Sequence, residues 1–173
     1  MQRYSPLISL AISLIALPVF GANLLDSPLK TAKIFCSLQI NGRLWANDDY
    51  QDFAKIATPN LINVVNDAIQ KNKQWVGRHP GSKPPLGNGI GFISVLDSPF
   101  ACIPKLITLS NKTAAVAVKY THKPGAQYPE TPLVTDYLRL LKSGKSWVID
   151  DIEYGGGGSQ GMTLKRSLKN IDW

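Results

Sequence analysis

The sequence predicts an α+β protein, in which N-terminal helices pack on an antiparallel sheet and a short helix closes the chain. Two observations predict this class. Apolar residues recur at helical spacing up to about residue 73 and at a spacing of two from about residue 105. In residues 135–154, two runs rich in leucine, β-branched and aromatic residues flank a short polar connection with a glycine, which is typical of a β-hairpin.

The first residues predict a secretory signal peptide. Arg3 precedes residues 7–17, an apolar run broken only by two serines, and Pro18 and small residues follow. The run is too short to span a bilayer, which takes about 20 residues. We therefore expect residues 1–22 to be removed and residues 23–173 to form one α+β domain in the periplasm, without a membrane span. The alternative is an N-terminal core helix.

The two cysteines of the chain, Cys36 and Cys102, are expected to form a disulfide in an oxidising compartment. Closing so long a loop stabilises a fold by roughly 4 kcal/mol in the chain-entropy model. The alternative is two buried free thiols. Neither cysteine belongs to a CxxC pair or has a histidine nearby, so redox or nucleophilic chemistry is not predicted.

Positive charge is concentrated in the middle of the chain. Residues 71–145 contain eleven Lys or Arg against three Asp or Glu, a local net charge of +8. Such a surface suits lipid head groups, anionic envelope polymers or an acidic protein partner, and the simpler alternative is a solvated basic face. Aromatic residues are not interleaved with the basic ones, so no nucleic-acid partner is expected.

Three helices are expected first. Ser27-Pro28 predicts the start of a helix that ends at Asn41-Gly42, with Leu29, Ala32, Phe35, Cys36 and Ile40 facing the core. Asp48 and Asp49 predict the start of a second helix through Ala57, with Tyr50, Phe53 and Ala54 inward. Thr58-Pro59 predicts a third helix, with Leu61, Val65, Ala68 and Ile69 as its apolar stripe.

Residues 77–91 are expected to form a loop, because they contain five glycines and three prolines. The segment also carries Arg78, His79 and Lys83. It is either a surface connection or the part of the chain that contacts a partner. Arg78 and His79 are therefore candidate interaction residues.

The sheet is expected to follow this loop. Residues 92–96 predict a short strand or an approach to one, residues 105–110 and 113–122 predict an antiparallel pair, and residues 123–132 predict a polar loop. In the second strand of that pair, Val116, Val118 and Tyr120 share one face and Ala115, Ala117 and Lys119 share the other.

The hairpin of residues 135–154 carries a second strand with apolar groups on both faces. Trp147 and Ile149 are expected to point one way, and Val148 and Ile152 the other. A strand of this kind is expected in the middle of a sheet whose two faces are at least partly covered.

A glycine-rich connector, residues 155–161, leads to the final helix, for which Thr163 is the expected cap and Leu164, Leu168 and Ile171 the apolar side. The connector satisfies G-x-G-x-x-G, but the second strand and acidic residue of a dinucleotide-binding unit do not follow it. We interpret these glycines as a flexible connector. No cofactor is expected, and no histidine or cysteine spacing predicts a metal site.

Asp150, Asp151 and Glu153 form an acidic cluster in the second strand of the hairpin. Neighbouring strand residues point to opposite faces, so Asp151 and Glu153 can share a face whereas Asp150 and Asp151 cannot. With Tyr137, they are candidate pocket or interaction residues. The alternative is a strand end in water or carboxylates paired with nearby lysines.

The segments LDSPFACIPK and YLRLLKSGKSWVIDDIEYGGGGSQGMTLKRSL resemble a bacterial envelope family of the YbjP/YqhG type, a domain of unknown function. The W-x-I-D-D-I stretch and the helix after it carry most of the resemblance. It implies a fold like nuclear transport factor 2 (cystatin-like), a curved antiparallel sheet that closes over helices as a cone. The family has no established catalytic residues, so none are assigned here.

Export without a catalytic constellation favours a non-enzymatic periplasmic protein that binds a partner in the envelope. A sharper hypothesis is an immunity protein that blocks a toxin delivered to the periplasm. The alternative is an enzyme or small-molecule binder with its site inside the cone, which is expected to include Asp151, Glu153 or Tyr137. A third hypothesis is binding to anionic envelope polymers through the basic region.

Overall fold

The computed structural model describes residues 27–42, 44, 50–87, 89–94, 99–121, 134–156 and 161–173. The expected signal peptide, the capping acids Asp48 and Asp49 and the expected loop 123–132 lie outside these residues. The described elements are α1 (Pro28–Ile40), α2 (Gln51–Ala54), α3 (Pro59–Arg78), β1 (Ala101–Leu109), β2 (Thr113–Thr121), β3 (Thr135–Ser143), β4 (Ser146–Glu153) and α4 (Leu164–Lys169). The predicted α+β class is confirmed.

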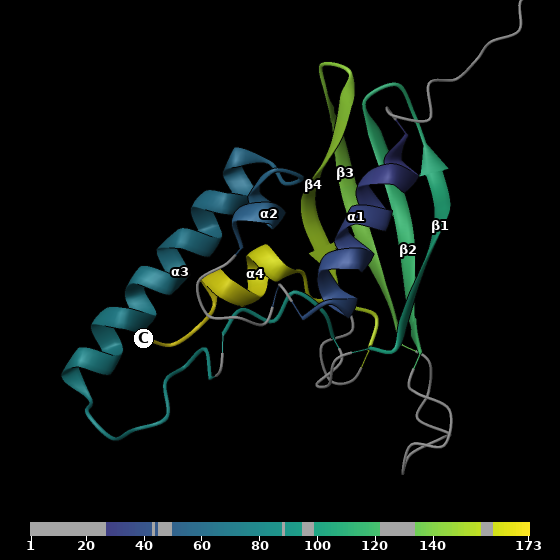
Figure 1. Ribbon diagram of the computed structural model, residues 1–173. Helices are drawn as coiled ribbons and strands as arrows, with labels where there is room; N and C mark the ends of the chain where they lie inside the picture. The colour runs from purple at the N-terminus through teal and green to yellow at the C-terminus, as the bar shows by residue number, and fades with distance from the viewer. Residues whose placement is uncertain are drawn as a thin grey trace, which may run out of the picture.

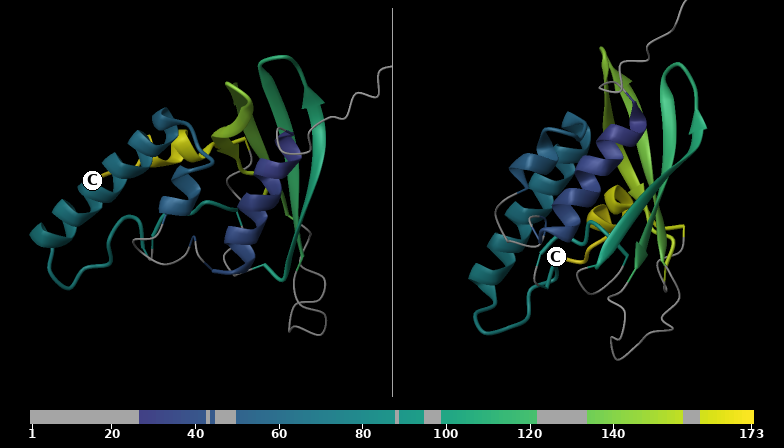
Figure 2. Two further views of the ribbon diagram at one scale, coloured as in Figure 1. Left: turned by 45° about the horizontal axis from the view of Figure 1, so that its top comes forward. Right: turned by 45° about the vertical axis from the view of Figure 1, so that its right-hand side comes forward.

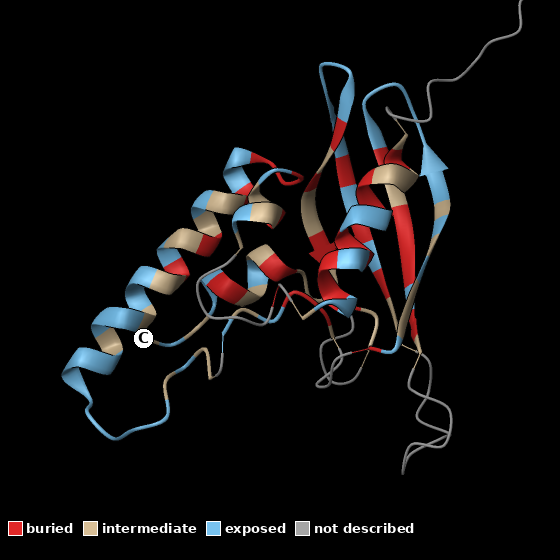
Figure 3. Ribbon diagram, viewed as in Figure 1, coloured by how far each residue is buried: buried red, intermediate tan, exposed pale blue. Residues whose placement is uncertain are grey.

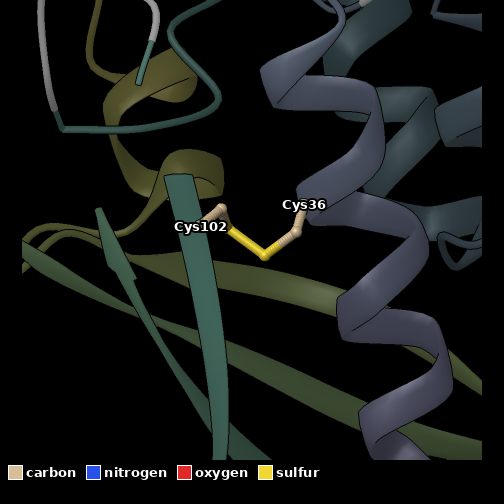
Figure 4. The surroundings of a disulfide bond; sticks show 2 residues. All are labelled: Cys36 and Cys102. Atoms are coloured by element: carbon tan, nitrogen blue, oxygen red, sulfur yellow. A yellow bond between two sulfur atoms is a disulfide. The ribbon is translucent and has the colours of Figure 1, made fainter. Parts of the chain in front are cut away.

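The four strands form one antiparallel sheet in the order β1-β2-β3-β4, so each strand pairs with its neighbour in the sequence (Figure 1). Helix α1 lies against one face of the sheet, whereas α3 and α4 lie beyond the β4 edge (Figures 1 and 2). The disulfide between Cys36 and Cys102 joins α1 to β1, as predicted (Figure 4). The Thr31 hydroxyl donates to the main-chain oxygen of Trp147 at 2.6 Å and so connects α1 to β4.

Strand alternation gives the sheet two unlike faces. The core face, which meets α1, carries the buried residues Val116, Val118, Leu138, Leu140 and Ile149. In the described part of the chain no helix lies on the opposite face, which we call the outer face, and Figure 3 shows exposed stretches alternating with buried ones along the strands. The outer face consists of Ile103, Lys105, Thr108, Thr113, Ala115, Ala117, Lys119, Thr135, Tyr137, Arg139, Leu141, Val148, Asp151 and Glu153.

The expected position of β4 in the middle of the sheet is wrong, because β4 is the last strand. A bulge explains the misleading pattern. Leu140 pairs with Ile149 and Arg139 pairs with Asp151, which leaves Asp150 without a partner in β3. Ile149 and Ile152 therefore lie on the same core face, opposite Leu140 and Leu138, and Ile152 does not share a face with Val148.

The free edge of β4 is closed by main-chain contacts from two other segments. Ile149 donates to the oxygen of Ile56 at 2.7 Å and accepts from the nitrogen of Thr58 at 2.8 Å. Further along the same strand, Glu153 bridges to Thr163. The second helix ends at Ala54 and not at the predicted Ala57, because residues 56–58 are extended along this edge.

The other helices depart from the prediction at single positions. Ile40 is exposed, because the buried stripe of α1 is centred on Phe35 and Gln39, and Ile40 follows Gln39 by about 100° around the helix. Helix α3 begins at the predicted cap, where the Thr58 hydroxyl accepts from the nitrogen of Leu61, but it continues to Arg78 and includes Gly77. The predicted loop therefore starts at His79.

Two strand boundaries also differ. Strand β1 begins at Ala101 and not at residue 105, and residues 92–94 are not a strand, although Phe92 and Ile93 are buried. The final helix begins as predicted, because the Thr163 hydroxyl accepts from the nitrogen of Arg166 and Leu164 and Leu168 are buried. Ile171, predicted on the same side of the helix, lies beyond its end at Lys169, although it packs against the core.

The first two glycines of the connector are packed against β3 and the residue before it. A Cβ atom on residue 155 would lie 1.7 Å from the main-chain oxygen of Thr135, and one on residue 156 would lie 2.7 Å from a methyl of Val134. The interpretation of the connector as flexible is therefore wrong at Gly155 and Gly156, where only glycine allows the close approach.

We predict that Gly155→Ala lowers the free energy of unfolding by roughly 3 kcal/mol or more, because the main chain of β3 or the connector has to move. Gly77→Ala is the matched control. A Cβ there meets nothing within 4 Å, and alanine in a helix is favoured over glycine by about 1 kcal/mol. Urea unfolding measures both variants, and equal effects would contradict the prediction.

We predict that replacing Cys36 and Cys102 by alanine lowers the free energy of unfolding by about 4 kcal/mol, because the loop between them spans 66 positions. Denaturant unfolding of the wild type with and without reductant is the measurement. Reductant should lower the midpoint of the wild type and leave that of the double variant unchanged.

Candidate functional site

The outer face exposes large apolar side chains. Ile103 is 55 % exposed, Tyr137 38 % and Leu141 39 %, and Ala117 forms a small buried floor between its neighbours. Three more exposed apolar residues, Phe100, Ile107 and Leu109, lie on or beside β1. Leu109 is in register with Ala114 on the core side of the sheet and so does not belong to the outer face. Exposed large apolar residues on one face, as at Ile103, Tyr137 and Leu141, are typical of an interaction surface.

Charged side chains are unevenly distributed across the outer face. Lys105 and Lys119 lie on β1 and β2, whereas the carboxylates of Asp151 and Glu153 lie on β4. Arg139 pairs with Glu153, with 2.5 Å between Nη2 and Oε2 and 3.1 Å between Nε and Oε2. Because both side chains are partly exposed, this pair orients the two groups more than it stabilises the fold.

The three predicted site residues on the hairpin are brought to this face. Tyr137 pairs directly with Glu153, and Arg139 pairs with Asp151 in the next row. Asp151 is also engaged by the main chain, since its Oδ1 accepts from the nitrogens of Ile152 and Lys165 at 2.9 and 3.1 Å. Tyr137 is exposed on this face, and Glu153 is partly exposed there while its carboxylate is held by Arg139.

Asp150, at the bulge, points away from the other two acids. Its Oδ1 accepts from the Thr58 hydroxyl at 3.0 Å and lies 2.8 Å from Lys165 Nζ. It thereby joins the start of α3 and the start of α4 to the edge of β4. The acidic cluster seen in the sequence is thus divided between two locations, the outer face for Asp151 and Glu153 and the β4 edge for Asp150.

Arg78 and His79 lie at the end of α3, which extends away from the sheet (Figures 1 and 2). Both are exposed. The His79 ring stacks on Trp75 with 4.2 Å between centroids, and its Nδ1 lies 2.9 Å from the main-chain oxygen of Trp75. The structure does not bring these two candidates together with Tyr137 and Glu153.

The basic residues of the middle region occupy three separate places and form no single surface in the described chain. One group is on the outer face, and a second, with Lys71, Arg78 and Lys83, is near the end of α3. The third is at the two hairpin turns, where the nitrogen of Lys142 donates to the oxygen of Lys112 and Lys142 Nζ lies 5.8 Å from the ring centre of Trp147.

A buried acid, Asp136, was not among the predicted site residues. Its side chain is fully buried on the core face, where Oδ2 accepts from the nitrogen of Ser94 and Oδ1 accepts from the nitrogen of Gly155, each at 2.9 Å. The Ser94 hydroxyl also donates to Oδ1. Strand alternation was the available signal, because Asp136 shares its face with Leu138 and Leu140.

Two buried tyrosines lie near Asp136. The Tyr154 hydroxyl donates to the main-chain oxygen of Gly91, and the buried Tyr120 hydroxyl interacts with the Asp136 carboxylate. Burial and the nearby charge of Asp136 raise the pKa of both tyrosines. Burial also raises the pKa of Asp136, and the hydrogen bonds from Ser94 and Gly155 oppose that rise only in part.

No protein-family model matches the chain, and no curated protein sequence matches it. The resemblance to the bacterial envelope family therefore stays a prediction. Among the described helices, none combines the length and apolar character that a bilayer span requires. The described residues contain no cluster of three or more His, Cys, Asp or Glu with a geometry suited to a metal ion.

We predict that the pKa of Asp136 in the folded protein lies above its ordinary value of 3.8. The folded state then binds this proton more tightly than the unfolded state. The resulting stabilisation is fully present below pH 3.8 and is lost as the pH rises through the folded pKa. A carboxyl ¹³C titration by NMR measures the pKa, and Asp136→Asn should lack this part of the pH dependence of stability. A pKa at or below 3.8 would contradict the prediction.

Proposed function

We propose that this chain is an exported periplasmic protein that acts by binding another protein and not by catalysis. The outer face of the sheet is the proposed binding surface. The observation that carries the proposal is the apolar content of that face, where Ile103, Tyr137 and Leu141 are exposed and no described helix covers them. An exposed tyrosine among apolar and paired charged residues is the composition expected of a binding surface.

The disulfide supports the exported location. Disulfides persist in oxidising compartments, and Cys36–Cys102 joins the helix on the core face to the edge strand of the same sheet. The bond therefore holds β1, with Ile103 and Lys105, in a fixed position relative to the core. A fixed surface loses little conformational freedom when a partner binds.

The buried acid supports binding over catalysis at the centre of the fold. Both carboxylate oxygens of Asp136 accept hydrogen bonds from the protein itself, and the side chain is inaccessible to solvent. Its contacts fasten the segment at Ser94 and the connector at Gly155 to β3. Asp136 is thus a structural acceptor, and the groups directed outward are those of the outer face.

The sharper form of the proposal is an immunity protein that blocks a toxin delivered to the periplasm. Export, a disulfide and a rigid binding face suit that role. Expression of the chain in the periplasm of a toxin-sensitive bacterium should then protect it from a toxin encoded beside its gene. Absence of a neighbouring secreted effector, together with no protection, would overturn this form and leave the binding proposal to the next experiment.

We predict that Tyr137→Glu abolishes capture of the partner from envelope extract, because a carboxylate replaces the exposed ring at the centre of the face. Ile34→Glu is the matched control, because Ile34 is also 38 % exposed but lies on α1. Mass spectrometry identifies the proteins that wild type and control retain and Tyr137→Glu loses, and titration of the purified partner confirms the difference. Equal capture by all three proteins would contradict the proposed binding surface.

A further inference from the structure

We infer that a second copy of this chain occupies the outer face in the absence of another partner, with a two-fold axis running parallel to the strands. The inference rests on the proposed function in one respect, since it uses the same face. It adds the identity of the first occupant and a consequence, that any other protein must displace this copy. Two independent features of the face support it: the order of its side chains and its area.

The order of side chains is visible in one row across the sheet. Strand pairing places Lys105, Ala117, Tyr137 and Glu153 side by side, in that order from β1 to β4. A two-fold axis parallel to the strands keeps each row at its height and reverses its order. Lys105 of one copy then faces Glu153 of the other, and Tyr137 faces Ala117.

Both contacts of this row are complementary. The exposed lysine on β1 meets the Glu153 carboxylate on β4, which within its own copy already pairs with Arg139. Each contact between the copies would therefore add a lysine to an existing arginine–glutamate pair. The tyrosine ring, 38 % exposed, meets Ala117, which has the smallest side chain of the row. Large residues opposite small ones are the way in which facing sheets interdigitate.

A two-fold axis across the strands fits less well. It would place β1 over β1 and β4 over β4. Lysines would then lie near lysines at one edge of the interface, and carboxylates near carboxylates at the other. Like charges opposite one another disfavour an interface. Among face-to-face arrangements, the parallel axis is therefore the one that the charge distribution supports.

The area of the face suits a weak dimer. Four strands about 4.8 Å apart, with about eight residues each rising about 3.3 Å, cover roughly 19 by 26 Å, or about 500 Å². Two copies would therefore bury about 1,000 Å² in total, which is near the lower limit for a specific interface. A dimer of this size, with a dissociation constant in the range of about 10 to 100 μM, can give way to a tighter partner.

A charge exchange tests the inference with its own control. Lys105→Glu and Glu153→Lys each place like charges in the facing row and should weaken the dimer by about tenfold. The charge variants are made in an Arg139→Gln background, because Arg139 pairs with Glu153 within each copy and would repel a lysine at position 153. In that background the double variant exchanges the two charges and should restore the dissociation constant to within about threefold of that of Arg139→Gln alone. Ile34→Glu, on α1, should leave it unchanged. Sedimentation equilibrium of the purified secreted protein measures the constants, and circular dichroism shows that each variant is folded.

Two outcomes would overturn the inference. One is a protein that stays monomeric up to about 1 mM, well above the expected dissociation constant. The other is a dimer that the single charge variants leave intact or that the exchange does not restore.

The experiments also separate this inference from the proposed function. If the protein is monomeric and Tyr137→Glu still loses its partner, the inference fails and the proposed function stands. If the charge exchange behaves as expected but capture is independent of Tyr137, the proposed function fails and the inference stands.

Discussion

The buried carboxylate of Asp136 holds together the part of the fold where the segment before β1, the start of β3 and the segment after β4 meet. It accepts hydrogen bonds from Ser94, before β1, and from Gly155, after β4, and so holds the segments on either side of the sheet against β3. Removing a carboxylate from water costs several kcal/mol unless donors replace the lost hydration. Here two main-chain nitrogens and the Ser94 hydroxyl do so. Gly155 is required in the same place, because its main chain lies against the Thr135 oxygen.

The two edges of the sheet are protected in different ways. The β4 edge is covered by main chain from residues 56–58 and by Thr163, and the bulge at Asp150 turns that side chain toward both. The β1 edge has β2 as its only strand neighbour among the described residues, but Pro104 lacks a donor and a register shift follows Leu106. Proline and bulges both discourage pairing with further strands. In the part of the chain that the structure describes, the uncovered surface is therefore a face of the sheet and not an edge.

Much of the fold could be predicted from local patterns, because those elements are specified by their own residues. Thr58-Pro59 caps α3, Gly144 supplies the positive φ at the turn between β3 and β4, and Thr163 caps α4. The bulge could not be predicted, because it depends on the contacts that Asp150 makes with Thr58 and Lys165, far away in the sequence. The bulge puts Ile152 on the face opposite to the predicted one, and the resulting sequence pattern made an edge strand look central.

The candidate site could be predicted only in part. Tyr137 and Glu153 follow from the alternation of side chains along a strand. The row that joins them to Lys105 and Ala117 depends on the register between strands, which the sequence pattern does not give.

Among the described elements, the placement of α3 leaves the outer face without a covering helix. A chain with a four-stranded sheet and a twenty-residue helix has material to cover both faces. Here α1 takes the core face, where the disulfide and Thr31 hold it, and α3 packs beyond β4 on α4. Outer residues such as Ile103 and Leu141 then stay in water, at a cost that grows with their exposed apolar area. Selection for stability alone would favour polar residues at such positions, as on other sheets with one solvated face. The apolar character of these positions, together with Lys105 on the edge strand β1 and Glu153 on the edge strand β4, is the reason to propose that this face binds a protein.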